Sequence, residues 1–360
     1  MKITKKIASL ILYSFCMLFF YSCNSDENYT SIESPVVMDL TQVPYIKLSD
    51  YKFFEGDIKS QKPSYGVLPY KPESELFTDY AQKKRFVWMP NGEKATYVND
   101  HSILKLPIGA ALIKSFYYNN VQPSNTTRIV ETRIMIRKND GWIYANYVWN
   151  TEQTEAFLDL QGSTTPITFV ENSVQKTIDY VIPNEMQCAG CHTISGSKKP
   201  IGIKPQNLNF NYAFTDGTKN QLKKWVNFGY LENNLPSNII SVVNYKDTSK
   251  PLELRVRSYF DSNCAHCHQD GGYANFFNLK FAFNETVDQT KMGVCVSPNH
   301  IVPGIEGRII KPGNINQSLL YYRINTNDPY YRMPFLGRTI VQEEAVQLME
   351  QWINSLTDCP

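Results

Sequence analysis

Cys264-Ala265-His266-Cys267-His268 is the stretch of sequence around which the chain is organised. It has the form C-x-x-C-H, the pattern at which c-type haem is attached. Two thiols add to the haem vinyl groups, and the adjacent histidine binds the iron. Positions i, i+3 and i+4 share one helix face, so Cys264, Cys267 and His268 can all meet one porphyrin.

A second copy of the pattern, Cys188-Ala189-Gly190-Cys191-His192, lies upstream. The alternative is a zinc knuckle, which needs a matched second pair of cysteine or histidine ligands. Neither copy has such a pair close to it in the sequence. We therefore expect two covalently bound haem c groups, attached at Cys188 and Cys191 and at the corresponding cysteines of the downstream copy. His192 and His268 are the expected proximal iron ligands.

Length and charge limit the classes of function. The chain has 360 residues, enough for two or three domains with hydrophobic cores. Its formal net charge is +2 at pH 7, with basic and acidic residues mixed along the sequence. This balance gives no indication of nucleic-acid binding.

The N-terminus has the form of a secretory signal. Three lysines within the first six residues precede an apolar run over 7–21, which is too short to span a bilayer comfortably. The run ends in Phe20-Tyr21-Ser22-Cys23, which resembles the lipobox of bacterial lipoproteins although its first two residues depart from the usual pattern. We expect residues 1–22 to be a signal peptide and Cys23 to carry the lipid. Ordinary cleavage and an uncleaved anchor are the alternatives.

The eight cysteines can be assigned by role. Cys16 lies in the expected signal peptide, Cys23 is the expected lipid site, and four belong to the two C-x-x-C-H copies. Cys295 and Cys359 remain, and an even remainder in an oxidising compartment suggests a disulfide between them. The alternative is two separate reduced cysteines.

The first half of the chain alternates between β-type runs and turn residues. Residues 23–45 are polar and are expected to form a tether. Over 46–182 short β-branched runs are broken by Pro, Gly and Asn, and Asn139-Asp140-Gly141 predicts a hairpin turn. Alternation divides one run into two faces: Val130, Thr132, Ile134 and Ile136 on one, Glu131, Arg133, Met135 and Arg137 on the other. We expect a half-buried antiparallel sheet in a β-sandwich-like domain that shelters a haem or docks a partner.

Residues 183–244 form the expected first haem segment. After the C-x-x-C-H copy, Thr218 with Gln221 has the spacing of a capping box and predicts the start of a short helix. Gly229 predicts its end. The segment is small for a complete cytochrome core, so we expect it to pack against its neighbours.

Residues 245–360 have the order of parts of a small cytochrome c. Pro251 predicts the start of a helix that leads into Cys264. Thr339 with Gln342 predicts the cap of a final helix with one apolar face. The predicted fold class is therefore an α+β multidomain chain, with a β-sandwich-like domain followed by mainly α-helical cytochrome c-type haem segments.

Met333 is the predicted sixth ligand of the second haem. It precedes a proline in a loop just before the last helix, where a thioether can be held over the iron. Ligation by His and Met raises the reduction potential and suits electron transfer. His266 is expected to be a spacer that faces solvent. The sixth ligand of the first haem stays open, with a vacant position as one alternative and the following candidates from other segments: Met89, His101, Met135, Met292 and His300.

The chain resembles a family of bacterial dihaem c-type cytochromes, some of them encoded beside a parallel β-helix repeat protein. The resemblance runs nearly end to end and rests on the following stretches: Leu48-Ser49-Asp50-Tyr51, Pro69-Tyr70, Leu76-Phe77-Thr78-Asp79-Tyr80-Ala81, Lys84-Arg85-Phe86-Val87, Glu131-Thr132-Arg133, Ile182-Pro183-Asn184, Asn207-Leu208-Asn209, the two C-x-x-C-H copies, Gly293-Val294-Cys295, Met333-Pro334 and Glu350-Gln351-Trp352-Ile353. The last domain alone also resembles the cytochrome c modules of planctomycete-type multidomain proteins. The family implies haem and a cell-envelope location and supplies no substrate.

These observations favour an exported, membrane-anchored dihaem c-type cytochrome that transfers electrons to redox partner proteins of the cell envelope. We expect an outer-membrane lipoprotein facing either the periplasm or the cell surface. An enzyme is the alternative, either a dihaem peroxidase-like protein or another haem oxidoreductase with an open first haem. A third hypothesis is a lipoprotein whose β-rich domain recognises a partner or glycan.

Overall fold

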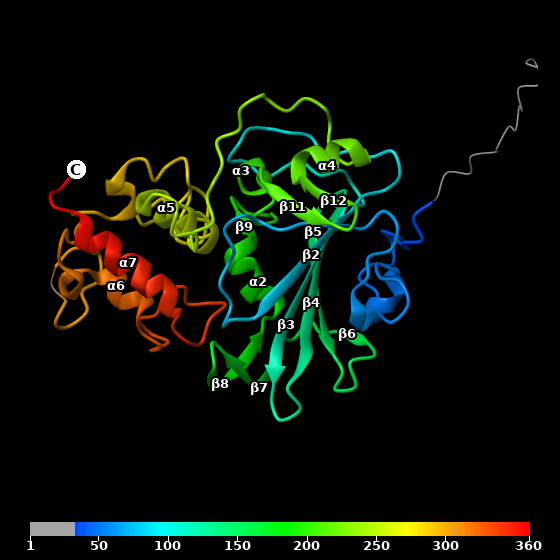
Figure 1. Ribbon diagram of the computed structural model, residues 1–360, viewed down its shortest axis with the longest axis horizontal. Helices are drawn as coiled ribbons and strands as arrows, with labels where there is room; N and C mark the ends of the chain where they lie inside the picture. The colour runs from blue at the N-terminus through cyan, green and yellow to red at the C-terminus, as the bar shows by residue number, and fades with distance from the viewer. Residues whose placement is uncertain (1–32, 306) are drawn as a thin grey trace, which may run out of the picture. The chain divides into compact units, whose positions relative to one another are not determined.

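The computed structural model describes residues 33–305 and 307–360 (Figure 1). The predicted signal peptide, the lipid site Cys23 and the first part of the tether lie outside the described residues. Residues Ser34–Pro360 form one compact unit. Within the described part of the chain, no helix is long and apolar enough to cross a membrane.

One antiparallel sheet of eight strands dominates the fold. Its strands follow the order β1-β2-β3-β4-β5-β6, and a hairpin of two further strands joins it through β3. The strands are β1 (Leu68–Pro69), β2 (Gln82–Trp88), β3 (Ala111–Val121), β4 (Thr126–Lys138), β5 (Gly141–Trp149), β6 (Ala156–Leu158), β7 (Ser163–Glu171) and β8 (Val174–Ile182). The predicted hairpin at Asn139-Asp140-Gly141 is confirmed, because it connects β4 to β5.

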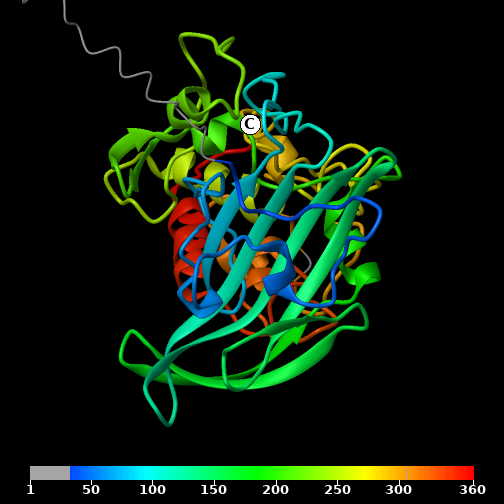
Figure 2. The ribbon, with the colours of Figure 1, turned by 90° about the vertical axis from the view of Figure 1, so that its right-hand side faces the viewer.

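Both faces of this sheet are buried, so the half-buried sheet expected from the alternation is wrong. One face packs against residues 43–67, whose aromatic side chains include Tyr51 and Phe53, and Figure 2 shows this segment in blue crossing the strands. The opposite face packs against the residues that follow β8. Glu131 and Met135, expected on the exposed face, are therefore buried too.

Short helices carry the rest of the fold. The described residues contain α2 (Glu185–His192), α3 (Pro205–Leu208), α4 (Gln221–Phe228), α5 (Leu252–Asn263), α6 (Leu319–Ile324) and α7 (Glu343–Ser355). They also contain two small hairpins, β9 (Thr193–Ile194) with β10 (Ser197–Lys198) and β11 (Asn211–Phe214) with β12 (Gly217–Asn220). The 3-10 helices are η2 (Leu48–Tyr51), η3 (Ile58–Ser60), η4 (Gln289–Met292) and η5 (Ile315–Gln317).

The predicted fold class is wrong. The sheet is a single large antiparallel one rather than a sandwich, and helix accounts for only 20% of the structure. The segments that follow the sheet are not mainly α-helical, because loops, turns and small hairpins separate their helices. Between the end of α5 and the start of α6, for example, the described residues form turns, isolated β-bridges and the 3-10 helices η4 and η5, with no α-helix.

Some of the predicted helix boundaries are confirmed and the predicted caps are not. Gly229 ends α4 in the left-handed conformation, and α5 begins directly after Pro251, as predicted. The two predicted capping boxes are wrong. Asn220 caps α4 through a bond from the Lys223 amide, since Thr218 belongs to β12. Gln342 precedes α7 without a side-chain cap.

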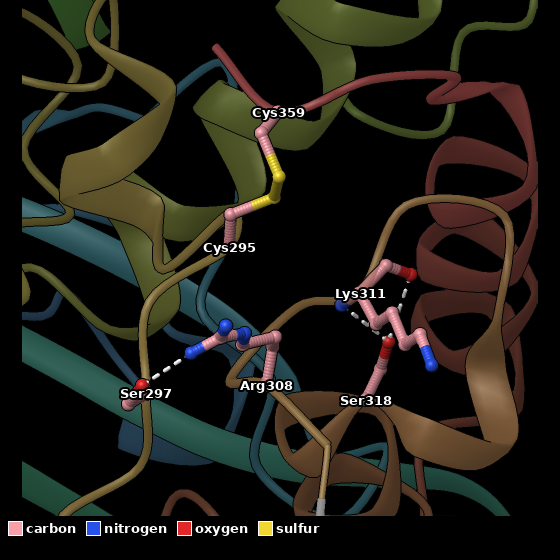
Figure 3. Close-up of a disulfide and its surroundings, with 6 residues drawn as sticks. All are labelled: Cys295, Ser297, Arg308, Lys311, Ser318 and Cys359. Atoms are coloured by element: carbon pink, nitrogen blue, oxygen red, sulfur yellow. Dashed lines mark hydrogen bonds between the residues drawn. A yellow bond between two sulfur atoms is a disulfide. The ribbon is translucent and has the colours of Figure 1, made fainter.

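The last third of the chain has a core of its own. Helices α5 and α7 pack together through Phe260 and Trp352, whose rings meet edge to face. Cys295 and Cys359 form a disulfide, which ties this core to the C-terminus (Figure 3). Ser318 lies nearby and fixes the loop before α6 by accepting a hydrogen bond from the amide of Lys311 at 2.9 Å.

Candidate functional site

The first C-x-x-C-H copy lies on a two-turn helix with a strong start. Asn184 and Gln187 form a reciprocal capping box, in which each side chain accepts from the other residue's amide, at 2.9 and 3.0 Å. Helix α2 therefore begins at Glu185 and carries Cys188, Cys191 and His192 within its last five residues.

The second copy begins where α5 ends. Cys264 is the C-cap of that helix, and the motif continues as a turn. The amide of His268 donates to the carbonyl of Cys264 at 3.0 Å, and the amide of Cys267 donates to the same oxygen at 3.1 Å. These bonds keep the i, i+3 and i+4 residues at helical spacing although the helix has ended.

The two motifs meet. The sulfur atoms of Cys191 and Cys267 are 4.0 Å apart, and Cys267 Sγ lies 3.6 Å from the carbonyl oxygen of Gly190. The segments that follow are also joined, since the amide of Ser195 donates to the carbonyl of Gly271 at 2.9 Å. Residues 76 positions apart in the sequence are thus neighbours. No pattern in the sequence indicated this contact.

His266 joins the two cysteines. One donor atom from each of Cys191, His266 and Cys267 lies within 4.8 Å of the others. His266 is buried, so the expectation of a spacer that faces solvent is wrong. The hydrogen bond with Cys267 and the nearby His266 lower the pKa of the Cys191 thiol to about 4 despite its burial. Cys267 keeps its proton, because the same hydrogen bond and its own burial raise its pKa.

His192 is oriented for metal binding. Its Nδ1 donates to the carbonyl oxygen of Lys199 at 2.9 Å, with the tautomer assigned from this acceptor. Such a bond fixes the ring and leaves Nε2 free for a metal, as is usual for ligating histidines. Burial lowers the pKa of His192 to about 4, so the ring is neutral at physiological pH.

His268 lies in an aromatic environment. Its ring centroid is 5.1 Å from that of Phe281 and 6.4 Å from that of Phe277. Burial lowers its pKa to about 4 as well. Its Nδ1 is buried and has no hydrogen-bond partner among the described residues, so nothing there fixes this ring as the Lys199 carbonyl fixes that of His192.

A cavity of about 810 Å³ opens beside the first motif. Cys188, Cys191, His192 and His266 line it, and Met333 lies in the same wall. Cavities that bury a cofactor-sized ligand fall in the range of roughly 300–1,000 Å³. This space is therefore large enough to hold a planar organic group against α2.

The loop that carries Met333 is held from two sides. Buried Arg338 donates to the carbonyl oxygen of Met333 at 3.0 Å. Asp79, from the segment before β2, accepts from the amides of Thr339 and Ile340 at 2.7 and 3.1 Å. The backbone of this loop is thus fixed at the cavity wall, and the β-rich part of the chain helps to position it.

The five candidates for the sixth ligand of the first haem differ in whether they reach the cavity. His101 and Met135 line the cavity. Met89 and Met292 are buried in apolar cores, at 1% and 0% exposure, and do not reach it. His300 is exposed and lies beside Phe277, on the side of His268.

The residues present fit a covalently attached haem. Each motif offers two cysteines and a histidine at the required spacing, and both histidines are neutral at physiological pH. His192 already has the partner that a ligating histidine needs, and a cavity of suitable size adjoins it. The fit to a cavity concerns the first motif alone, because Cys264, Cys267 and His268 do not line this cavity.

The same geometry reopens the zinc alternative. The sequence argument against zinc was that each Cys pair lacks a second pair nearby, yet the fold makes each motif the neighbour of the other. A site at Cys191, His266 and Cys267 would have two sulfur ligands and one nitrogen ligand, a set that zinc accepts. It would leave Cys188, Cys264 and both motif-ending histidines unused.

Comparisons of the chain with models of protein families, with curated proteins and with solved structures found no match.

Proposed function

We propose that this chain is an exported, membrane-anchored dihaem c-type cytochrome that carries electrons between proteins of the cell envelope. One observation supports the proposal most strongly. His192, at the end of a C-x-x-C-H helix, is neutral, is fixed through Nδ1 by the Lys199 carbonyl, and lines an adjoining cavity. When bound, haem supplies a one-electron couple.

The chain's own residues would act as attachment and orientation groups. Cys188 and Cys191 would hold one haem, and the cysteines of the second motif would hold the other. His192 and His268 would bind the irons. Because the sulfurs of Cys191 and Cys267 are 4.0 Å apart, the attachment points of the two haems would be adjacent. This proximity favours exchange of an electron within the chain.

Met333, predicted as the sixth ligand of the second haem, lines the cavity beside the first motif, and it would supply a soft sixth ligand to a haem held there. Ligation by His and Met raises the potential of that haem and leaves no open site on its iron for oxygen or peroxide. The signal and lipid motifs at the N-terminus support a location in the cell envelope, with redox proteins there as partners. The resemblance to bacterial dihaem cytochromes points the same way.

Optical and EPR spectra of the purified full chain, oxidised and reduced, test this function against the enzyme alternative. We expect two low-spin haems that neither bind carbon monoxide nor react with peroxide. A high-spin haem that binds carbon monoxide would instead favour a dihaem peroxidase-like or other oxidoreductase function at the first site.

A second candidate function is a metal-stabilised envelope protein without haem. The observation that favours it is the cluster of Cys191, His266 and Cys267. Two variants separate the candidates, because each removes a residue that only one of them uses. His266→Ala should abolish zinc binding and leave two haems attached, whereas Cys188→Ser should disrupt attachment of the first haem and leave zinc binding intact.

A further inference from the structure

Three basic side chains lie in one row across the central sheet. Arg85 of β2 pairs with Lys114 of β3, Lys114 pairs with Arg133 of β4, and Arg133 pairs with Asn146 of β5. Residues in register on adjacent antiparallel strands project to the same face. The four side chains therefore form a polar band over four strands, and all four line the cavity beside the first motif.

An apolar band runs beside the polar one. The neighbouring row on the same face consists of Val87, Leu112, Met135 and Tyr144. Leu112, Met135 and Tyr144 also line the cavity. One wall of the cavity thus changes from apolar to cationic over two residues of each strand. A ligand that fits this wall has an apolar body and an anionic edge.

The row is tied to the first motif. Asn146 donates to the carbonyl oxygen of Pro183, just before α2, at 2.6 Å. Its amide nitrogen also lies 3.9 Å from the sulfur of Cys188. The end of the row therefore touches one of the two cysteines expected to carry haem.

Two of the three cations are already paired. Arg85 bonds to Glu75 at 3.3 Å. Arg133 bonds to buried Glu131 through two nitrogen atoms, at 2.9 and 2.5 Å. For Lys114, no carboxylate, carbonyl or hydroxyl of the described residues accepts a hydrogen bond from Nζ, and its nearest recorded partner is the Phe116 ring, at 4.7 Å from the centroid.

An unpaired cation in such a place is costly. Burial and the nearby cations, Arg85 among them, hold the pKa of Lys114 well below its ordinary value. The side chain is half-buried at the cavity wall, and a partly desolvated charge without a partner opposes folding. Lys114 is therefore the one cation of the row without a carboxylate partner among the described residues, and an anion that entered the cavity would stabilise its charged form.

Most other charged groups of the cavity wall have partners within the protein. Lys204 bonds to Asp261 at 2.8 Å and Lys280 to Asp270 at 2.7 Å. Arg338 donates to carbonyl oxygens around the Met333 loop. Arg332 bonds to a carbonyl at 3.5 Å, while its Nε stays buried and unpartnered. Lys114 is the group that lies in register with paired arginines beside Cys188.

We propose that the row of Arg85, Lys114 and Arg133 binds the propionate carboxylates of the haem attached at Cys188 and Cys191. The inference rests on the proposed function and gives the β-rich half of the chain a specific role. The apolar band would contact the body of the porphyrin, and Lys114 would pair with a carboxylate at its edge. A free dicarboxylate is the other source of the same chemistry, and the test separates the two.

The test uses the matured full chain with Lys114→Met and a matched control, Lys138→Met, at the far end of β4. Haem content is measured first, because two haems per chain in the wild type test the dihaem part of the proposed function separately. Removing a positive charge beside a haem disfavours the electron gained on reduction. We expect one of the two reduction potentials to fall by about 59 mV, a tenfold change in the one-electron equilibrium, with the other unchanged.

The control should leave both potentials unchanged, and Lys114→Arg, which keeps the charge, should retain both wild-type potentials even if Lys114→Met matures poorly. Two unaltered potentials in Lys114→Met with both haems attached would overturn the inference. So would saturable binding of succinate to the matured wild type that Lys114→Met abolishes without moving either potential, because the row would then serve a free carboxylate.

Discussion

The contact between the two C-x-x-C-H motifs can be tested by joining them. Without haem, the double variant Cys188→Ser/Cys264→Ser keeps one cysteine in each motif. Their sulfurs, 4.0 Å apart, need to approach to about 2.05 Å for a disulfide. Rotation of the two side chains can supply part of this movement. We therefore expect a mild thiol oxidant to join Cys191 to Cys267 within the folded chain.

The magnitude follows from the loop that the bond would close. The two cysteines are 76 residues apart. A cross-link over that length lowers the entropy of the unfolded chain and so raises its free energy by about 4.5 kcal/mol at 25 °C. Strain from moving the sulfurs reduces the gain. The oxidised variant should therefore unfold at a higher urea concentration than the reduced one, by up to that free energy.

Peptide mapping without reductant identifies the linked pair, and urea unfolding measures the stability. The control is Cys188→Ser/Cys267→Ser, which keeps Cys191 and Cys264 and should form no cross-link in the folded chain. If Cys191 and Cys267 are both alkylated in the folded protein and never join, the motifs are not neighbours. The reasoning about adjacent haems and about a shared zinc site would then fail together.

Three further predictions address the Met333 loop, the disulfide and a half-buried lysine. Met333→Ala should lower one reduction potential and abolish any charge-transfer band from iron(III) to methionine sulfur, whereas unchanged spectra would exclude Met333 as a ligand. Cys295→Ser opens a loop of 64 residues, so urea unfolding should show a loss of about 4 kcal/mol; no loss would mean that the disulfide contributes nothing to stability. Burial lowers the pKa of Lys83 to about 7, below its unfolded value, so the unfolded chain binds the extra proton and the stability contributed by this group rises from pH 7 toward pH 9. Lys83→Met should flatten that rise in urea unfolding at the two pH values, and an unchanged slope would contradict the assignment.

Local features were predictable from the sequence because short-range chemistry determines them. The turn at Asn139-Asp140-Gly141 needs only a residue that accepts unusual backbone angles, and Gly141 has a φ of 143°. Gly229 ends its helix with a φ of 87° for the same reason. None of these predictions depends on what the segment packs against.

The predictions were wrong where tertiary packing determines which side chains are buried and which segments are helical. Alternation in β4 indicated one exposed face, but Glu131 is buried because Arg133 and Tyr180 satisfy its carboxylate, at 2.5 and 2.6 Å. The loops between the short helices of the last two segments could not be distinguished from helix by motif order alone. That mistake led to the wrong fold class.

The functional geometry was the least predictable part. The contact between Cys191 and Cys267 depends on how two segments pack, and neither sequence contains a sign of it. The row that includes Lys114 requires the register of four strands, which side-chain alternation within one strand does not give. His266 was expected to be a spacer, yet the fold places it beside the sulfurs of both motifs.

The most direct test of the account is the intact mass of the exported chain, measured together with its haem and zinc content. The account predicts the mass of the processed chain plus two covalently attached haems, with no zinc. Serine at Cys188 or at Cys264 should disrupt one attachment each. A chain with no haem and one zinc ion, lost in His266→Ala, would contradict the account and leave the metal-stabilised protein in its place.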